Sequence, residues 1–194
     1  MKSVLLLATS LVAVVPCIAS AEELSHNYVE AGVSRLHDNL PSWVGTDNNY
    51  DGGYLKGSAA FGTSGFYGFG MYRQGTRDVG SGDEVDNTTS QFGVGYGYRI
   101  APRVELIGEG SYLRNDEWAY TSDTWRASAG VRGAMGDHVE GWAKAHYTDG
   151  SFGGSRYSLE VGGQYKLTDT WGITAGVEAG DDRDVYTVGM RASF

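Results

Sequence analysis

The sequence predicts an all-β fold, an up-and-down antiparallel transmembrane β-barrel with ten strands, and eight strands are the main alternative. Three observations support this prediction. Apolar and polar residues alternate in runs of about ten residues, long and short connections alternate along the chain, and the chain opens with a secretory signal. The composition agrees, with 30 Gly, 13 Tyr and only 3 Pro among 194 residues.

The alternating runs have a period of two, which is the period of a β-strand. We expect strands at residues 27–36, 50–61, 66–74, 88–100, 103–114, 123–134, 138–148, 156–167, 171–180 and 184–194. Short turns such as Ala101-Pro102 alternate with longer polar stretches such as residues 75–87. Outer-membrane barrels have short periplasmic turns and longer outer loops, so we expect both termini on the periplasmic side.

The first 21 residues resemble a bacterial secretory signal peptide. Lys2 precedes an apolar run from Val4 to Val15 that is too short to span a membrane, and the small-x-small pattern ends at Ala21. We expect cleavage after Ala21 and a barrel over residues 22–194. A buried N-terminal helix is the weaker alternative. Cys17 is the only cysteine and would leave with the signal, which excludes disulfides and cysteine nucleophiles from the barrel.

In nine of the ten strands, one phase is apolar through its middle and holds no charge, and the opposite phase carries the charged residues. Val29, Ala31 and Val33 illustrate the apolar phase, which we assign to lipid. The residues of the charged phase predict a lumen charge network: Glu30, Lys56, Glu105, Glu109, Arg126, Arg132, Glu140, Lys144, Glu160, Glu178 and Arg191. The segment 66–74 does not alternate clearly, and the sequence leaves its facing open.

Large aromatic residues lie near the two ends of the apolar runs and not in their middles. Trp125, Tyr157 and Tyr186 lie on the loop side, whereas Tyr98 and Trp171 lie on the turn side. Two such girdles are typical of membrane interfaces. A soluble β-sandwich would place the apolar phase inside, but the middles of these runs hold small residues. The pattern therefore favours the outer membrane of a Gram-negative cell envelope.

The last ten residues, "VYTVGMRASF", alternate regularly and end on an aromatic ring. A closing strand is required because a sheet edge cannot face lipid. A terminal aromatic residue behind such a strand resembles the signal that the outer-membrane insertion machinery reads. We therefore expect Phe194 to act as the assembly signal.

The connections also predict which lumen charges face each other, because each connection fixes the register of its two strands. Reflection about Met135-Gly136-Asp137 places Arg132 opposite Glu140. The longer loops fix the register less tightly, and they predict the pairs Glu30–Lys56, Lys144–Glu160 and Glu109–Arg126. Every pair joins unlike charges, so we expect a lumen crossed by salt bridges.

Three stretches carry a resemblance to a known family: "SHNYVEAGV", "DGGYLKGSAAF" and the hairpin "GVGYGYRIAPRVELIGEGSY". They resemble a family of small Gram-negative outer-membrane barrels, some members of which are named "sulfation-dependent quorum factor", and more generally OmpA-like transmembrane barrels. The resemblance covers most of residues 22–194. It implies an outer-membrane β-barrel and brings no catalytic residue.

A hydrolytic site is the one enzymatic alternative that the residues suggest. His146 lies on the inward phase with Ser158 nearby, and Asp123 and Asp149 lie near the same rim. A polar lumen histidine beside Lys144 and Arg126 explains His146 as well. The remaining histidines lack ligand spacing, and the Gly-rich runs lie within strands. We therefore expect no enzyme, no catalytic residue, no cofactor and no metal.

Three functions fit this prediction. The first is a structural or surface-interaction barrel with a plugged lumen, the second is a narrow passive pore, and the third is a rim hydrolase or lipid-modifying enzyme. Eight strands enclose a lumen that side chains can fill, and ten enclose little more, which favours the first. The expected partners are outer-membrane lipid, lipopolysaccharide and the insertion machinery, with an unknown extracellular ligand. The acidic net charge of −9 argues against nucleic acid.

Overall fold

The computed structural model describes residues 24–38, 48–78, 84–117, 120–150 and 154–194. The predicted signal peptide, residues 1–21, and its cleavage site after Ala21 lie outside the described residues. No helix within the described ranges is long and apolar enough to cross a bilayer.

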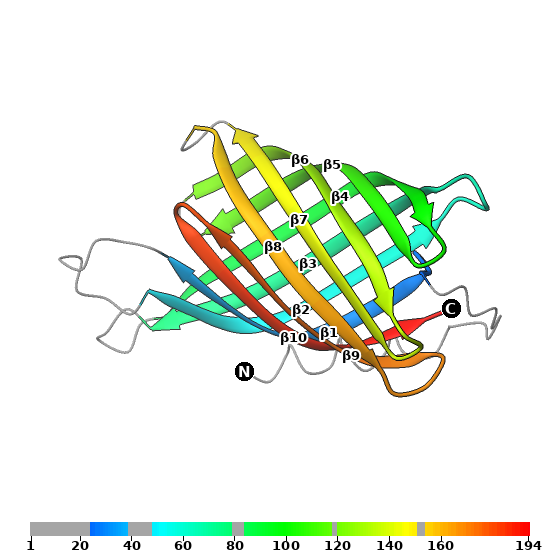
Figure 1. Cartoon of the computed structure of the whole chain (residues 1–194). Helices are drawn as coiled ribbons and strands as arrows, with labels where there is room; N and C mark the ends of the chain where they lie inside the picture. The colour runs from blue at the N-terminus through cyan, green and yellow to red at the C-terminus, as the bar shows by residue number, and fades with distance from the viewer. Residues whose placement is uncertain (1–23, 39–47, 79–83, 118–119, 151–153) are drawn as a thin grey trace.

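Within the described ranges, ten strands form one sheet. They are β1 (Tyr28–Asp38), β2 (Asn49–Ala60), β3 (Phe66–Asp78), β4 (Glu84–Ala101), β5 (Val104–Glu117), β6 (Tyr120–Met135), β7 (Val139–Gly150), β8 (Arg156–Lys166), β9 (Trp171–Gly180) and β10 (Arg183–Ser193). Each strand pairs antiparallel with the next one, and β1 pairs with β10, so the sheet closes into a barrel (Figure 1). The predicted all-β, ten-stranded, up-and-down barrel is confirmed.

The seam between β1 and β10 runs from Tyr28 opposite Ser193 to Asp38 opposite Arg183. Beyond it, the Phe194 amide donates to the Asn27 carbonyl at 3.0 Å. The seam leaves no open strand edge, which a lipid environment requires because unpaired backbone groups cannot be hydrated there. Figure 1 shows β1 and β10 side by side.

The outer face of the barrel is apolar. Val33, Val94 and Val188 are among its exposed residues, and Val33 retains 65% of its accessible surface. Near the loop end, a band of aromatic rings lies over β4 to β8, and Tyr112 lies opposite Trp125 in the register. Phe92 and Tyr112 are 5.2 Å apart between centroids, and Tyr147 lies 5.3 Å from both Trp125 and Tyr157. Such a band is typical of a membrane interface.

The strands are longer at the loop end than the sequence predicts. The predicted loop 75–87 is largely part of a hairpin, in which β3 and β4 remain paired to Asp78 and Glu84. The predicted loop around Trp118 is likewise bordered by the pair Glu117–Tyr120. Most residues of these extensions are polar, and the backbone pairing continues beyond the point where the apolar alternation ends.

The facing of β3, which the sequence left open, is resolved by the structure. Tyr67, Phe69, Met71 and Arg73 line the lumen, and Tyr72 is exposed on the opposite face. The inward phase of this strand is itself largely apolar. Alternation between apolar and polar residues therefore could not distinguish its two faces.

Candidate functional site

The candidate site is the lumen, which contains two differently organised regions. We call the first the turn-end layer: His26, Glu30, Tyr54, Glu105, Arg132, Glu140, Gln164 and Arg191. We call the second the loop-end cavity, a space of about 230 Å³ that extends from Asp181 and Asp182 at the β9–β10 hairpin down to His26, Tyr54, Arg132 and Arg191 of the turn-end layer.

Arg191 and Glu30 form the centre of the turn-end layer. Arg191 Nη2 lies 2.6 Å from Glu30 Oε2, and its Nε donates to the same oxygen at 2.8 Å. The Tyr54 hydroxyl donates to the other Glu30 oxygen at 2.7 Å, and Lys56 Nζ lies 4.0 Å from it. The guanidinium also lies over the Tyr28 ring at 4.1 Å. A carboxylate with 2% exposure is thus satisfied on both oxygens.

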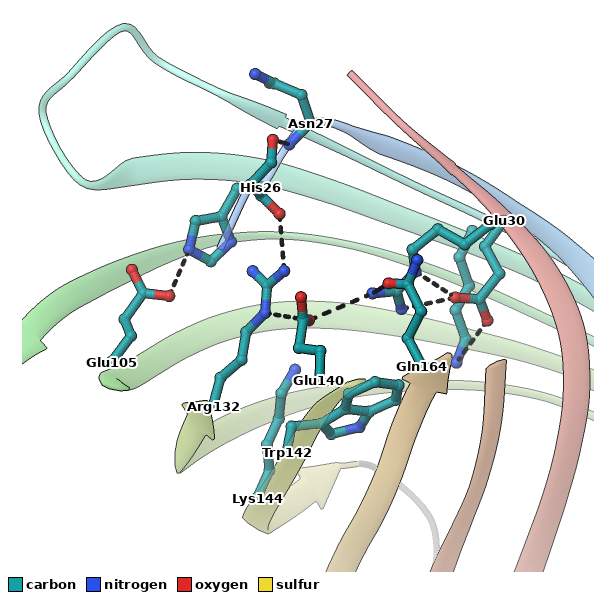
Figure 2. Close-up of polar contacts among 12 residues, drawn as sticks. His26, Asn27, Glu30, Glu105, Arg132, Glu140, Trp142, Lys144 and Gln164 are labelled. Atoms are coloured by element: carbon teal, nitrogen blue, oxygen red, sulfur yellow. Dashed lines mark hydrogen bonds and ion pairs between the residues drawn. The ribbon is translucent and has the colours of Figure 1, made fainter. Parts of the chain in front are cut away.

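A second ion pair continues the layer. Arg132 Nε donates to Glu140 Oε1 at 2.5 Å, and its Nη2 donates to the Ser25 carbonyl at 2.9 Å (Figure 2). Arg191 Nη1 lies 3.9 Å from the same Glu140 oxygen. Glu140 therefore joins the two arginines into one network, and Gln164 accepts from Arg191 at 3.5 Å.

Residues 24–27 lie against this network. Leu24 is buried, and the Ser25 hydroxyl donates to the Phe194 carbonyl at 3.1 Å. The His26 ring stacks on Tyr67 at 3.9 Å, and its Nε2 lies 2.9 Å from Glu105 (Figure 2). A Cβ at Gly97 would lie 2.0 Å from Glu105, so glycine makes room for this contact. These groups and the turn-end layer line the turn end of the lumen, and together we call them the floor.

Charged pairs continue above the floor. Lys144 donates to Glu109 at 2.9 Å, and the Tyr67 hydroxyl donates to the same oxygen at 2.8 Å. Nearer the loop end, Arg126 Nη2 lies 3.0 Å from Glu178, which also accepts from Ser158 at 2.7 Å. The ion pairs Lys144–Glu109 and Arg126–Glu178 join strands that are not neighbours in the sheet, so they brace the barrel across its lumen.

All eleven residues of the predicted network are buried or line the cavity. The register places Glu30 opposite Lys56 and Lys144 opposite Glu160, as expected. Arg132 lies opposite Trp142 and contacts Glu140 diagonally. The predicted register of these two strands therefore differs from the observed one by two residues.

The predicted pair Glu109–Arg126 is wrong. Ser128 lies opposite Glu109, and Ser111 lies opposite Arg126. The two side chains instead bond across the lumen, Glu109 with Lys144 and Arg126 with Glu178. Reflection about a loop places only neighbouring strands, so it could not find contacts that depend on the curvature of the barrel.

Sequence reasoning did not find the polar aromatic and amide members of the network. Tyr54, Tyr67 and Gln164 contribute a hydroxyl or amide to buried charges. Tyr54 and Gln164 lie on the same phase as the charged residues of their strands. Their position on the inward phase therefore indicates that Tyr54 and Gln164 face the lumen, but charged residues alone do not reveal them as members of the network.

The predicted hydrolytic constellation does not assemble. Asp123 is exposed on the outer face opposite Arg114, and Asp149 lies opposite Trp125. Ser158 lies opposite His146, but its hydroxyl donates to Glu178.

His146 has other neighbours. Its Nδ1 is 2.7 Å from Ser128, and its Nε2 lies 3.3 Å from Glu160 without hydrogen-bond geometry. Ser128 and His146 lie opposite each other in paired strands, where the ladder occupies the backbone amides that an oxyanion hole would need. Within the described ranges, no group of three or more His, Cys, Asp or Glu could hold a metal ion.

No protein-family model matches the sequence, and no curated protein matches it. Similar solved structures are the β domain of the Bordetella autotransporter BrkA, the translocator domain of the autotransporter NalP from Neisseria meningitidis, and the outer membrane protein OprG from Pseudomonas aeruginosa. BrkA has a TM-score of 0.53 and 16% identity, and the match covers 86% of this chain and 98% of that one. NalP has a TM-score of 0.51 and 11% identity, and the match covers 90% of this chain and 91% of that one. OprG has a TM-score of 0.48 and 10% identity, and the match covers 88% of this chain and 98% of that one.

At these identities the likeness concerns the fold. It agrees with the apolar outer face and the closed sheet, so this chain has the fold of the outer-membrane β-barrels that it resembles. The comparisons do not support the narrower name "sulfation-dependent quorum factor".

Proposed function

We propose that this chain is a non-conducting outer-membrane barrel that acts at its loop end as a structural or surface-interaction protein. The observation that carries the proposal is the turn-end layer. Arg191, Glu30, Arg132 and Glu140 form one connected ion-pair network there, and residues 24–27 pack against it. Ions would have to cross this network to pass through the lumen.

The ion-pair network of the turn-end layer is energetically costly to open. Removing one partner of a buried ion pair leaves an uncompensated charge and costs about 3–5 kcal/mol. Opening a path would separate more than one of these contacts at once. Thermal motion alone would then open the floor rarely, which supports a plugged lumen over a steady pore.

The narrow passive pore is the second candidate, and the loop-end cavity favours it. The cavity is lined by charged side chains and extends from the β9–β10 hairpin down to His26 and Arg132. A rearrangement limited to the floor would connect this space to the other side of the barrel. We propose no enzymatic activity, because Ser128 and His146 lack an oxyanion site.

The proposed orientation places the short turns in the periplasm and the loop end at the cell surface. Two ion pairs on the outward face near the loop end fit the level of lipopolysaccharide head groups. They are Arg35–Asp51 at 2.6 Å and Arg114–Asp116 at 3.4 Å. Lipid, lipopolysaccharide and, during assembly, the insertion machinery are the proposed partners.

Planar-bilayer recording of refolded protein tests the proposal. We expect insertion without steady conductance, with a general porin refolded in the same detergent as the positive control. Folded protein must first be verified by its heat-modifiable migration on a gel. Reproducible single-channel conductance steps of the wild-type protein would favour the passive pore.

A further inference from the structure

The loop-end cavity is lined by more cations than anions. Eight Lys and Arg side chains line it, against five Asp and Glu side chains, in a chain whose net charge is −9. Seven of these cations lie within 4.0 Å of a carboxylate. Among the residues that the structure describes, no carboxylate lies within that distance of the eighth, Arg73.

Arg73 lies on the inward face of β3, opposite Tyr54 and Thr89. Its Nη2 lies 3.4 Å from Thr89 Oγ1, which is a long contact, and its buried Nε has no hydrogen-bond partner. Two other arginines, Arg126 and Arg183, act on it as repelling charges. Glu178 attracts it, but Arg126 and Ser158 already bind that carboxylate.

A second unpartnered polar atom faces the same cavity. Thr124 Oγ1 is buried without a hydrogen-bond partner, and Thr124 lines the cavity two residues before Arg126. A hydroxyl group can donate a hydrogen bond to an anion, as a guanidinium can. Unsatisfied buried donors are rare in folded proteins and call for a partner. In this cavity, the unpartnered donors are Thr124 Oγ1 and Nε of Arg73, the arginine that lies within 4.0 Å of no described carboxylate.

We propose that the loop-end cavity binds a soluble oxyanion, a carboxylate or phosphate group, with Arg73 as the principal ligand and Arg126 and Thr124 as further donors. The planar guanidinium of arginine matches both kinds of group and binds them by charge-assisted hydrogen bonds. A bound anion supplies a negative charge beside the Arg73 guanidinium and a hydrogen-bond acceptor for its Nε. The site needs access from the loop end only, so it is independent of whether the turn end conducts.

Calorimetric titration of the refolded barrel with sodium phosphate and with sodium acetate tests the proposal. Sodium chloride at equal ionic strength controls for screening, which acts on every exposed charge. We expect saturable binding of at least one of the two anions, and the better one identifies the group. Absence of saturable binding for both would overturn the proposal.

Substitutions then assign the binding to Arg73. R73Q should weaken it about tenfold or more, as expected for the loss of a charge-assisted hydrogen bond. T124V removes the hydroxyl and should weaken it less. R35Q is the matched control, because Arg35 lies on the outward face beside Asp51, and this variant should bind as the wild type does.

A stability readout covers the case in which R73Q folds poorly. The anion should raise the unfolding temperature of the wild type and raise it less for R73K, which keeps the charge but loses the planar fork. Equal affinity in wild type, R73Q and T124V would overturn the assignment. So would an equal anion-induced shift in wild type and R73K.

Discussion

The two regions of the lumen use the same kinds of side chain but differ in how far their charges are neutralised. In the turn-end layer, Glu30, Glu140 and Arg191 are buried and bonded on several sides. In the loop-end cavity, Arg126 and Glu178 are partly exposed, and Arg73 lies within 4.0 Å of no described carboxylate. The comparison shows that alternation alone makes a polar lumen, whereas the neutralisation of its charges depends on the partners that the fold brings to each of them.

Because of this difference, substitutions in the turn-end layer should lower the free energy of unfolding more than substitutions elsewhere. Glu30→Ala should have the largest effect, about 3–5 kcal/mol of unfolding free energy, because it leaves Arg191 without its main partner in a buried site. Urea unfolding of the refolded barrel measures the loss. Glu30→Gln keeps an acceptor for Arg191 and should lose less. Equal stability of Glu30→Ala and wild type would mean that the layer is hydrated.

The Arg132–Glu140 pair sharpens the comparison through a double-mutant cycle. Arg132→Ala should lower the unfolding free energy by about 3 kcal/mol, and adding Glu140→Ala should recover part of it. We expect a coupling energy of about 1–3 kcal/mol. The midpoint of the heat-modifiable gel shift gives the same comparison. Additive losses would show that the two side chains do not interact.

Gly97→Ala tests the contact between residues 24–27 and the floor. The new methyl group would lie 2.0 Å from Glu105 and 3.0 Å from His26, so the ion contact between them must shift. We expect a loss of about 1–3 kcal/mol, as for an overpacked site. Gly108→Ala is the control, because a Cβ there meets nothing within 4 Å. A loss of the same size in both variants would point to a backbone effect.

The outward pair Arg35–Asp51 should contribute least. Both side chains are 59% exposed, although their geometry is bidentate at 2.6 and 2.9 Å. Exposed pairs contribute about 0–1 kcal/mol, so Asp51→Asn should change urea unfolding only slightly. A loss as large as that of Glu30→Ala would remove the distinction between buried and exposed pairs on which the account depends.

The fold could be predicted from the sequence because the bilayer imposes a simple rule on every strand. Residues such as Val33 and Val188 face lipid, so the opposite phase faces the lumen. The rule fails where lipid ends, which is why the sequence predicts a loop at residues 75–87, where β3 and β4 remain paired to Asp78 and Glu84. It also fails for β3, whose inward phase holds Phe69 and Met71.

The sequence predicts which charged residues belong to the lumen network, but it predicts only some of the pairs that they form. Neighbouring strands give Glu30–Lys56 directly, whereas Lys144–Glu109 crosses the lumen and depends on barrel shape. The place of His26 in the floor, stacked on Tyr67, had no sequence signal. The lack of a carboxylate beside Arg73 is likewise visible only in three dimensions.

Cysteine labelling of intact cells tests the closed floor most directly. Cys17 lies in the predicted signal peptide, so residues 22–194 contain no cysteine of their own. Thr187 lines the loop-end cavity, whereas Thr174, on the neighbouring strand, is buried at the turn end. A small, membrane-impermeant, anionic thiol reagent added outside should label Thr187→Cys and leave Thr174→Cys unlabelled until the protein is denatured. Equal labelling of both positions would show that the lumen is open throughout and would contradict the account.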